Sequence, residues 1–86
     1  MVLDDVAANQ TAFNRARMEA CRQEKEDLLR RMGWNPMLGR ENLSAGIAGL
    51  LCWYYGGEGF RDRDPRMIPL QRVRKFARFY ARIKAA

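Results

Sequence analysis

The chain has 86 residues, of which 48% are hydrophobic and 30% charged, and its formal net charge is +6. This composition is typical of one small globular domain, residues 1–86, and so short a chain buries only about 60–65% of the surface that its unfolded form exposes. Because the chain has no histidine, one serine and one threonine, the usual nucleophile and base pairs cannot be assembled, and we expect neither catalysis nor a cofactor.

The two cysteines, Cys21 and Cys52, have no histidine with which to complete a zinc site. We expect both thiols to be reduced and packed in the core, with a disulfide between them as the alternative. Residues 1–10 have neither the basic nor the apolar part of a secretory signal, and the longest apolar run, 43–55, is shorter than the ~20 residues that span a bilayer. We therefore expect a cytoplasmic protein without a membrane span.

A long helix is predicted from Leu3 to Met32, where no Pro or Gly occurs and Ala, Arg, Glu, Met and Leu predominate. Asp4 and Asp5 suit its N-terminus, and Gly33 is expected to be the first residue beyond its C-terminal cap. Such a helix would be ~45 Å long, which is more than so small a domain covers, and its apolar stripe is sparse. We therefore expect its first turns to fray, or part of it to pack against a second copy in a homo-oligomer or against another partner.

A second helix is predicted over residues 44–55, with Asn42 or Ser44 as its cap. This segment is apolar on every side, so we expect it in the middle of the fold, between the other two helices. Gly46 and Gly49 are unfavourable within a helix. The close approach of another backbone is the expected compensation.

The segment CWYYGGEGF, residues 52–60, places three aromatic residues directly before Gly56 and Gly57. We expect the aromatics to form the last turn of the buried helix and one of the glycines to end it in the left-handed conformation. Tyr55 and Phe60 are left over by this interpretation, because the hydroxyl needs a partner and the ring lies in the following loop. A further loop is expected over RDRDPRMIP, residues 61–69.

Two segments, LLRRMGWNP (28–36) and LSAGIAGLLCWYYGGEGF (43–60), resemble the dimerisation half of Mor-type phage transcription activators. That half also runs from a helix through glycines into a short extended segment. The resemblance covers about a third of the chain, and no counterpart of the family's DNA-reading half is present in it. We assign no family from this resemblance.

The last helix is predicted to begin at Pro69 and to run to about Lys84. At about 100° per residue its apolar residues share one face, which we expect to be core: Leu70, Val73, Phe76, Ala77, Tyr80 and Ile83. The opposite face carries Arg74, Arg78 and Arg82, each one helical turn from the next without an acid between them. Phe79 projects beside these basic residues. An ordinary solvated helix face would account for the row of arginines as well.

Two functions are left once catalysis is set aside. The first is a protein-binding module, that is, a small regulatory inhibitor, adaptor or accessory subunit that docks on an acidic protein surface. The alternative is a small basic nucleic-acid-binding regulatory protein that lays its C-terminal Arg helix along phosphates. We favour the protein partner because no groove-reading motif accompanies the basic residues. The residues expected to contact the partner are Trp34, Tyr55, Phe60, Arg74, Arg78, Phe79 and Arg82.

Overall fold

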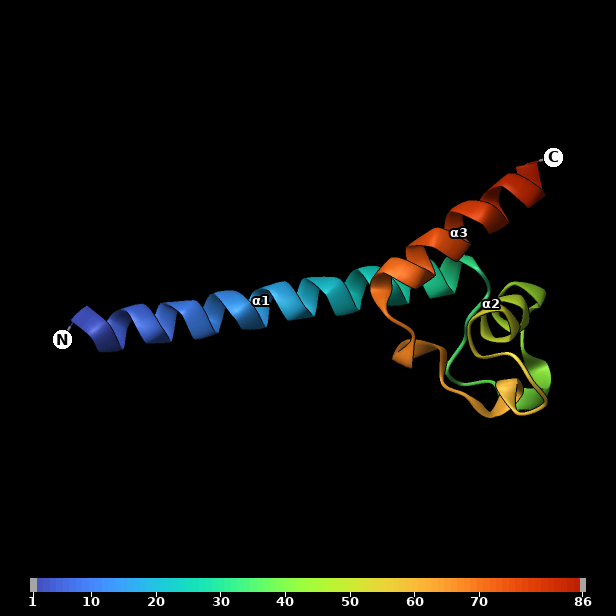
Figure 1. Cartoon of the computed structure of the whole chain (residues 1–86), viewed down its shortest axis with the longest axis horizontal. Helices are drawn as coiled ribbons and strands as arrows, with labels where there is room; N and C mark the ends of the chain where they lie inside the picture. The colour runs from blue at the N-terminus through green and yellow to red at the C-terminus, as the bar shows by residue number, and fades with distance from the viewer. Residues whose placement is uncertain (1, 86) are drawn as a thin grey trace.

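The described part of the chain consists of three α-helices and three short 3-10 turns (Figure 1). This computed structural model describes the backbone of residues 2–85 and the side chains of residues 11–39 and 41–85. The elements follow in the order α1 (Val2–Arg31), η1 (Arg40–Asn42), α2 (Ala45–Tyr55), η2 (Phe60–Asp62), η3 (Pro65–Met67) and α3 (Leu70–Ala85). No strand occurs in residues 2–85, so the predicted all-α class is confirmed.

Helix α1 extends far beyond the rest of the molecule (Figure 1). Every side chain from residue 11 to residue 23 is exposed, and the first buried side chain among its described residues is Leu29. The radius of gyration is 16.7 Å, whereas a compact chain of this length would have about 12 Å. The expectation that this helix is longer than the domain can cover is therefore confirmed. That its free part, residues 12–23, contacts a second copy or another partner stays a prediction.

The C-terminus of α1 ends in two backbone hydrogen bonds that require a residue with a positive φ angle, a conformation that glycine adopts easily. The Gly33 N–H donates to the Arg30 carbonyl (2.9 Å), and the Trp34 N–H donates to the Leu29 carbonyl (2.9 Å). This pair of bonds is the Schellman motif, with Gly33 at φ 96° in the left-handed region. The predicted helix end is confirmed, and the turn directs Trp34 back against the core.

The hydrophobic core lies at one end of the molecule, where the C-terminus of α1 meets α2 and α3. Its buried side chains are Leu29, Met32, Ile47, Leu50, Leu51, Ile68, Val73 and Phe76. Half-buried residues, among them Trp34, Tyr55 and Phe60, pack around this cluster. Because the core is so small, the fold depends on a few apolar residues from each helix rather than on α1 along its whole length.

Helix α2 does not lie between the other two helices, so that prediction is wrong. α1 packs mainly against α3, while α2 packs against η2 and α3. One face of α2 is buried through Gly46, Ile47, Leu50 and Leu51. The other face is exposed and carries Cys52, Trp53 and Tyr54. We expected so apolar a helix to be covered on every side. Because α1 and α3 pack directly against each other, α2 is covered on one face only.

The start of α2 is held very close to the end of α1. The Ser44 hydroxyl accepts a hydrogen bond from the Ile47 N–H (3.1 Å) and donates one to the Met32 carbonyl (2.6 Å). A Cβ atom added to Gly46 would lie 2.7 Å from that same carbonyl oxygen, which confirms the predicted close approach of a backbone. At Gly49 the neighbour is instead the Phe76 ring, 3.2 Å from such a Cβ.

Helix α3 begins one residue later than predicted, because the Pro69 carbonyl accepts the first bonds, from the N–H groups of Arg72 (3.0 Å) and Val73 (3.1 Å). Its apolar face is covered only in part. Val73 and Phe76 are buried, but Ile83 is 56% exposed. The face predicted to be core is therefore core along the first half of α3 and surface near its end.

Candidate protein-binding surface

Three of the predicted partner-binding residues, Trp34, Tyr55 and Phe60, are half-buried and pack against the core. Each has a guanidinium over its ring: Arg66 lies 5.7 Å from the Trp34 centroid, Arg63 lies 5.2 Å from that of Tyr55, and Arg61 lies 5.4 Å from that of Phe60. These arginines belong to the loop of residues 61–69, so the three aromatics support the loop that leads to α3. The three aromatics therefore do not form one cluster with the predicted residues on α3, which are Arg74, Arg78, Phe79 and Arg82.

A second group of aromatic residues lies where α2 and α3 meet. Phe79 is 55% exposed and Trp53 is 44% exposed, and both flank the buried ring of Phe76. The ring centroids are 5.7 Å apart for Trp53 and Phe76 and 6.0 Å apart for Phe76 and Phe79. We call these three residues the aromatic patch. Aromatic residues are enriched at the centres of protein interfaces, so the two exposed rings make this patch a candidate contact surface.

The sequence interpretation missed Trp53 as a surface residue. Its signal was ambiguous, because an apolar helix gives no indication of which face another element covers. In the structure Trp53 stands on the uncovered face of α2 and reaches the predicted residue Phe79 through Phe76.

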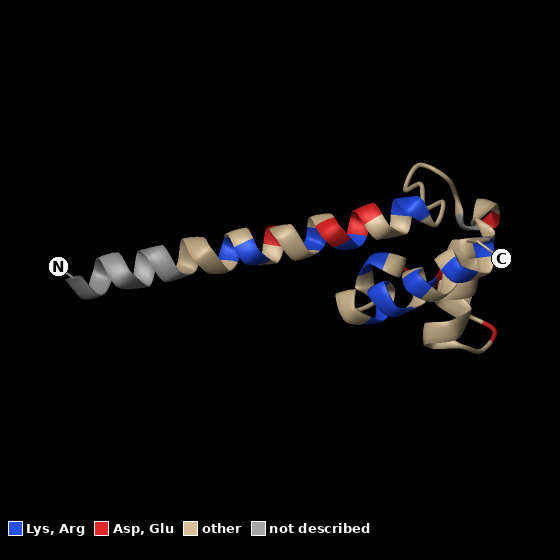
Figure 2. Cartoon of the chain, turned by 90° about the horizontal axis from the view of Figure 1, so that it is seen from above, with Lys and Arg blue, Asp and Glu red and all other residues tan. Residues whose placement is uncertain are grey.

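Helix α3 carries the whole net charge of the protein. It contains six basic residues and no acidic one: Arg72, Arg74, Lys75, Arg78, Arg82 and Lys84. The chain has 16 basic and 10 acidic residues, so the remainder is neutral, with ten of each. Figure 2 shows the basic residues of α3 as blue segments of its ribbon, whereas α1 carries both signs.

The arginine row of α3 is interrupted at its first member by an acid from α1. The Arg74 Nη2 donates to Glu24 Oε1 (2.7 Å), and the Arg74 Nε donates to Glu24 Oε2. The hydrogen bond from Arg74 lowers the pKa of Glu24, and the same bond raises the pKa of Arg74. Arg78 and Arg82 make no such pair among the described residues. The row therefore consists of Arg74, which links α3 to α1, followed by Arg78 and Arg82, which have no ion pair among the described residues.

Both thiols are exposed, which corrects the expectation that they are packed in the core. Cys21 lies on the uncovered part of α1 and Cys52 on the uncovered face of α2, and both are free. Among the described residues no group of three or more Cys, Asp or Glu side chains could hold a metal ion, and no helix is long and apolar enough to cross a membrane. The surface offers cations and aromatic rings, and aromatic residues and arginine are enriched at protein interfaces.

Comparison of the chain with protein-family models, with curated proteins and with solved structures gives no match.

Proposed function

We propose that the protein is a non-enzymatic protein-binding module that docks on the acidic surface of another protein through α3 and the aromatic patch. The carrying observation is that the entire net charge of +6 is on α3, directly beside the exposed rings of Trp53 and Phe79. Aromatic residues and arginine are the residue types enriched at the centres of protein interfaces. The corresponding roles are those of a small regulatory inhibitor, adaptor or accessory subunit.

The two parts of this surface would contribute in different ways. Trp53 and Phe79 lose exposed apolar area when a partner covers them, and a buried aromatic anchor of this kind contributes about 2 kcal/mol or more to binding. The cations near Phe79 on α3, Lys75 one turn before it and Arg82 one turn after it, attract carboxylates and speed association. The rings therefore determine mainly the dissociation rate, and the cations mainly the association rate.

The charge of α3 also bears on which partner is favoured. Two copies that met through this face in a symmetric dimer would bring the cations of one α3 near those of the other, and like charges at an interface are unfavourable. A partner with carboxylates has no such penalty. A different, acidic protein is therefore the better occupant of this face.

Nucleic acid is the second candidate, because a helix with six basic residues and no acid would also attract phosphates. The aromatic patch is the feature that distinguishes the two candidate functions. A phosphate contact needs the cations of α3 but not the rings, whereas a protein interface needs both.

The test begins with duplex DNA, single-stranded DNA and RNA, titrated at about 50 and about 200 mM salt. We expect weak binding to all three that falls steeply with salt. Binding tighter than about a micromolar at the higher salt would favour the nucleic-acid function instead.

The protein partner is sought by photocrosslinking in extracts of the native host, with a photoreactive phenylalanine analogue at position 79. The matched control carries the same analogue at position 37, because Met37 is 89% exposed but lies in the loop between α1 and α2. We expect one protein crosslinked from position 79 and not from position 37, and we expect Trp53→Ala to abolish it. Equal labelling from both positions, or labelling that Trp53→Ala leaves unchanged, would contradict the proposal.

A further inference from the structure

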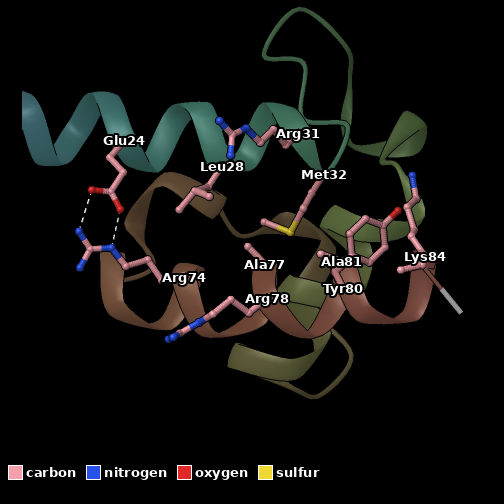
Figure 3. Close-up of a pocket in the computed structure, with 11 residues that line it drawn as sticks. Glu24, Leu28, Arg31, Met32, Arg74, Ala77, Arg78, Tyr80, Ala81 and Lys84 are labelled. Atoms are coloured by element: carbon pink, nitrogen blue, oxygen red, sulfur yellow. Dashed lines mark hydrogen bonds and ion pairs between the residues drawn. The ribbon is translucent and has the colours of Figure 1, made fainter.

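A groove with a volume of about 900 Å³ runs between α1 and α3 (Figure 3). Leu28 and Met32 contribute to its lining from α1, and Ala77, Tyr80 and Ala81 contribute from α3. Ala77 and Ala81 are one turn apart on α3, so their small side chains let the backbone of another helix come close. The floor of the groove is therefore apolar and is shaped for a packed element rather than for a water-filled channel.

The rim of the groove is basic. Arg31 stands on the α1 side, and Arg74, Arg78 and Lys84 stand on the α3 side (Figure 3). Among the described residues of the lining, Glu24 is the only acid, and Arg74 already binds it. Arg31 and Arg78 have no ion pair among the described residues. An occupant of the groove would therefore find two guanidiniums available for carboxylates, one on each side of an apolar floor.

We propose that this groove binds an acidic amphipathic helix of a partner protein. Apolar side chains of such a helix would cover Leu28 and Ala81, and its carboxylates would pair with Arg31 and Arg78. From Arg74 to Ala85 the α3 side of the groove spans 12 residues, and the rise of about 1.5 Å per residue between them gives ~16 Å, which corresponds to about three helical turns of partner. The groove shares α3 with the surface proposed above, but it contains neither Trp53 nor Phe79 and therefore does not depend on the aromatic patch.

Other occupants fit the groove less well. A nucleic acid would use the basic rim but would leave the apolar floor unfilled. A second copy of the chain would have to present an acidic helix, but residues 11–31 of α1 carry six basic residues and four acids, and three of these acids, Glu19, Glu24 and Glu26, are already paired with Arg22 or Arg74. An acidic helix from another protein satisfies both the floor and the rim.

The probe is a fluorescently labelled 14-residue peptide with leucines at i, i+3, i+4 and i+7 and glutamates elsewhere on its surface. Binding to the full chain is measured by fluorescence anisotropy at about 150 mM salt, where long-range attraction is screened. A control peptide has the same composition with its leucines distributed around the helix. We expect saturable binding of the first peptide and at least tenfold weaker binding of the second.

Variants then place the peptide on the groove. Arg78→Glu is expected to weaken binding about tenfold or more, whereas Arg82→Glu, the same charge change one turn further along α3 and outside the groove, changes it less than about threefold. Ala81→Trp fills the groove without changing any charge and is also expected to weaken binding at least tenfold. Circular dichroism confirms that each variant is folded.

Three results would overturn the proposal. They are equal losses in Arg78→Glu and Arg82→Glu, equal binding of the two peptides, and no saturable binding below about a millimolar. Phe79→Ala is expected to leave peptide binding unchanged, because Phe79 is not part of the groove lining. A failed crosslink from position 79 would therefore count against the proposed function without affecting the groove.

Discussion

Substituting Gly46 by alanine probes the closest backbone approach in the fold. On helix propensity alone this change would stabilise α2 by about 1 kcal/mol, because glycine is a poor helix former. In the folded chain, however, the new Cβ would lie 2.7 Å from the Met32 carbonyl oxygen, 3.0 Å from Tyr80 Cζ and 3.1 Å from Met32 Cβ. The neighbour at the shortest distance is backbone, so it cannot rotate away.

The magnitude follows from how far the elements must separate. To restore a contact of 3.4 Å, the start of α2 and the end of α1 would have to move apart by about 0.7 Å. This movement strains the Ser44–Met32 hydrogen bond of 2.6 Å, and overpacking of this kind typically costs about 1–3 kcal/mol. Because the closest neighbour is backbone, we take the upper part of this range, about 2–3 kcal/mol. Subtracting the propensity gain of about 1 kcal/mol leaves a net loss of ~1–2 kcal/mol, which lowers the unfolding midpoint of a domain this size by about 5–15 °C.

The assay is thermal unfolding followed by tryptophan fluorescence, because Trp34 packs against the core whereas the circular dichroism signal includes the free part of α1. Two glycines supply matched controls. Gly49→Ala meets only the Phe76 ring, at 3.2 Å, which can shift, and Gly39→Ala meets nothing within 4 Å. We expect Gly39→Ala, outside the α-helices, to keep the midpoint within about 3 °C of the wild-type value, and Gly49→Ala, which has the same propensity gain as Gly46→Ala, not to fall below the wild-type value. If Gly46→Ala were as stable as Gly49→Ala, the close packing of α1 on α2 would be wrong.

Three further predictions concern the ion pair, the thiols and the core. Arg74 lowers the pKa of Glu24 in the folded chain, so the ion pair should stabilise the fold fully above the ordinary glutamate pKa of about 4.3 and should lose this effect as the pH falls through the lowered pKa. The difference in unfolding midpoint between the wild type and Glu24→Gln, measured across a pH series, checks this. Cys21 and Cys52 should both react with a disulfide reagent in the native protein as fast as in urea, and a thiol that labels only on unfolding would show that it is buried. In native-state hydrogen exchange, the Leu50 amide should be protected to nearly the global free energy of unfolding, whereas amides in the free part of α1 should exchange through local fraying; similar rates at both places would contradict the position of the core.

Local signals in the sequence were sufficient for the helices and their ends. Gly33 ends α1 because a positive φ angle is easy for glycine, and Ser44 caps α2 because its hydroxyl reaches the N–H three residues later. Such signals act within about one helical turn, so they need no knowledge of what lies across the fold. The excess of basic residues over residues 70–85 is equally a property of the chain itself.

Tertiary structure decided which surfaces are covered. α2 is apolar on every side, and only the direct packing of α1 on α3 determined that Cys52 and Trp53 remain exposed. Likewise, Arg74 pairs with an acid 50 residues earlier in the chain, which no spacing along α3 could indicate. Coverage of a face and pairing of a charge depend on contacts between distant segments, and these contacts exist only once the helices are arranged in space.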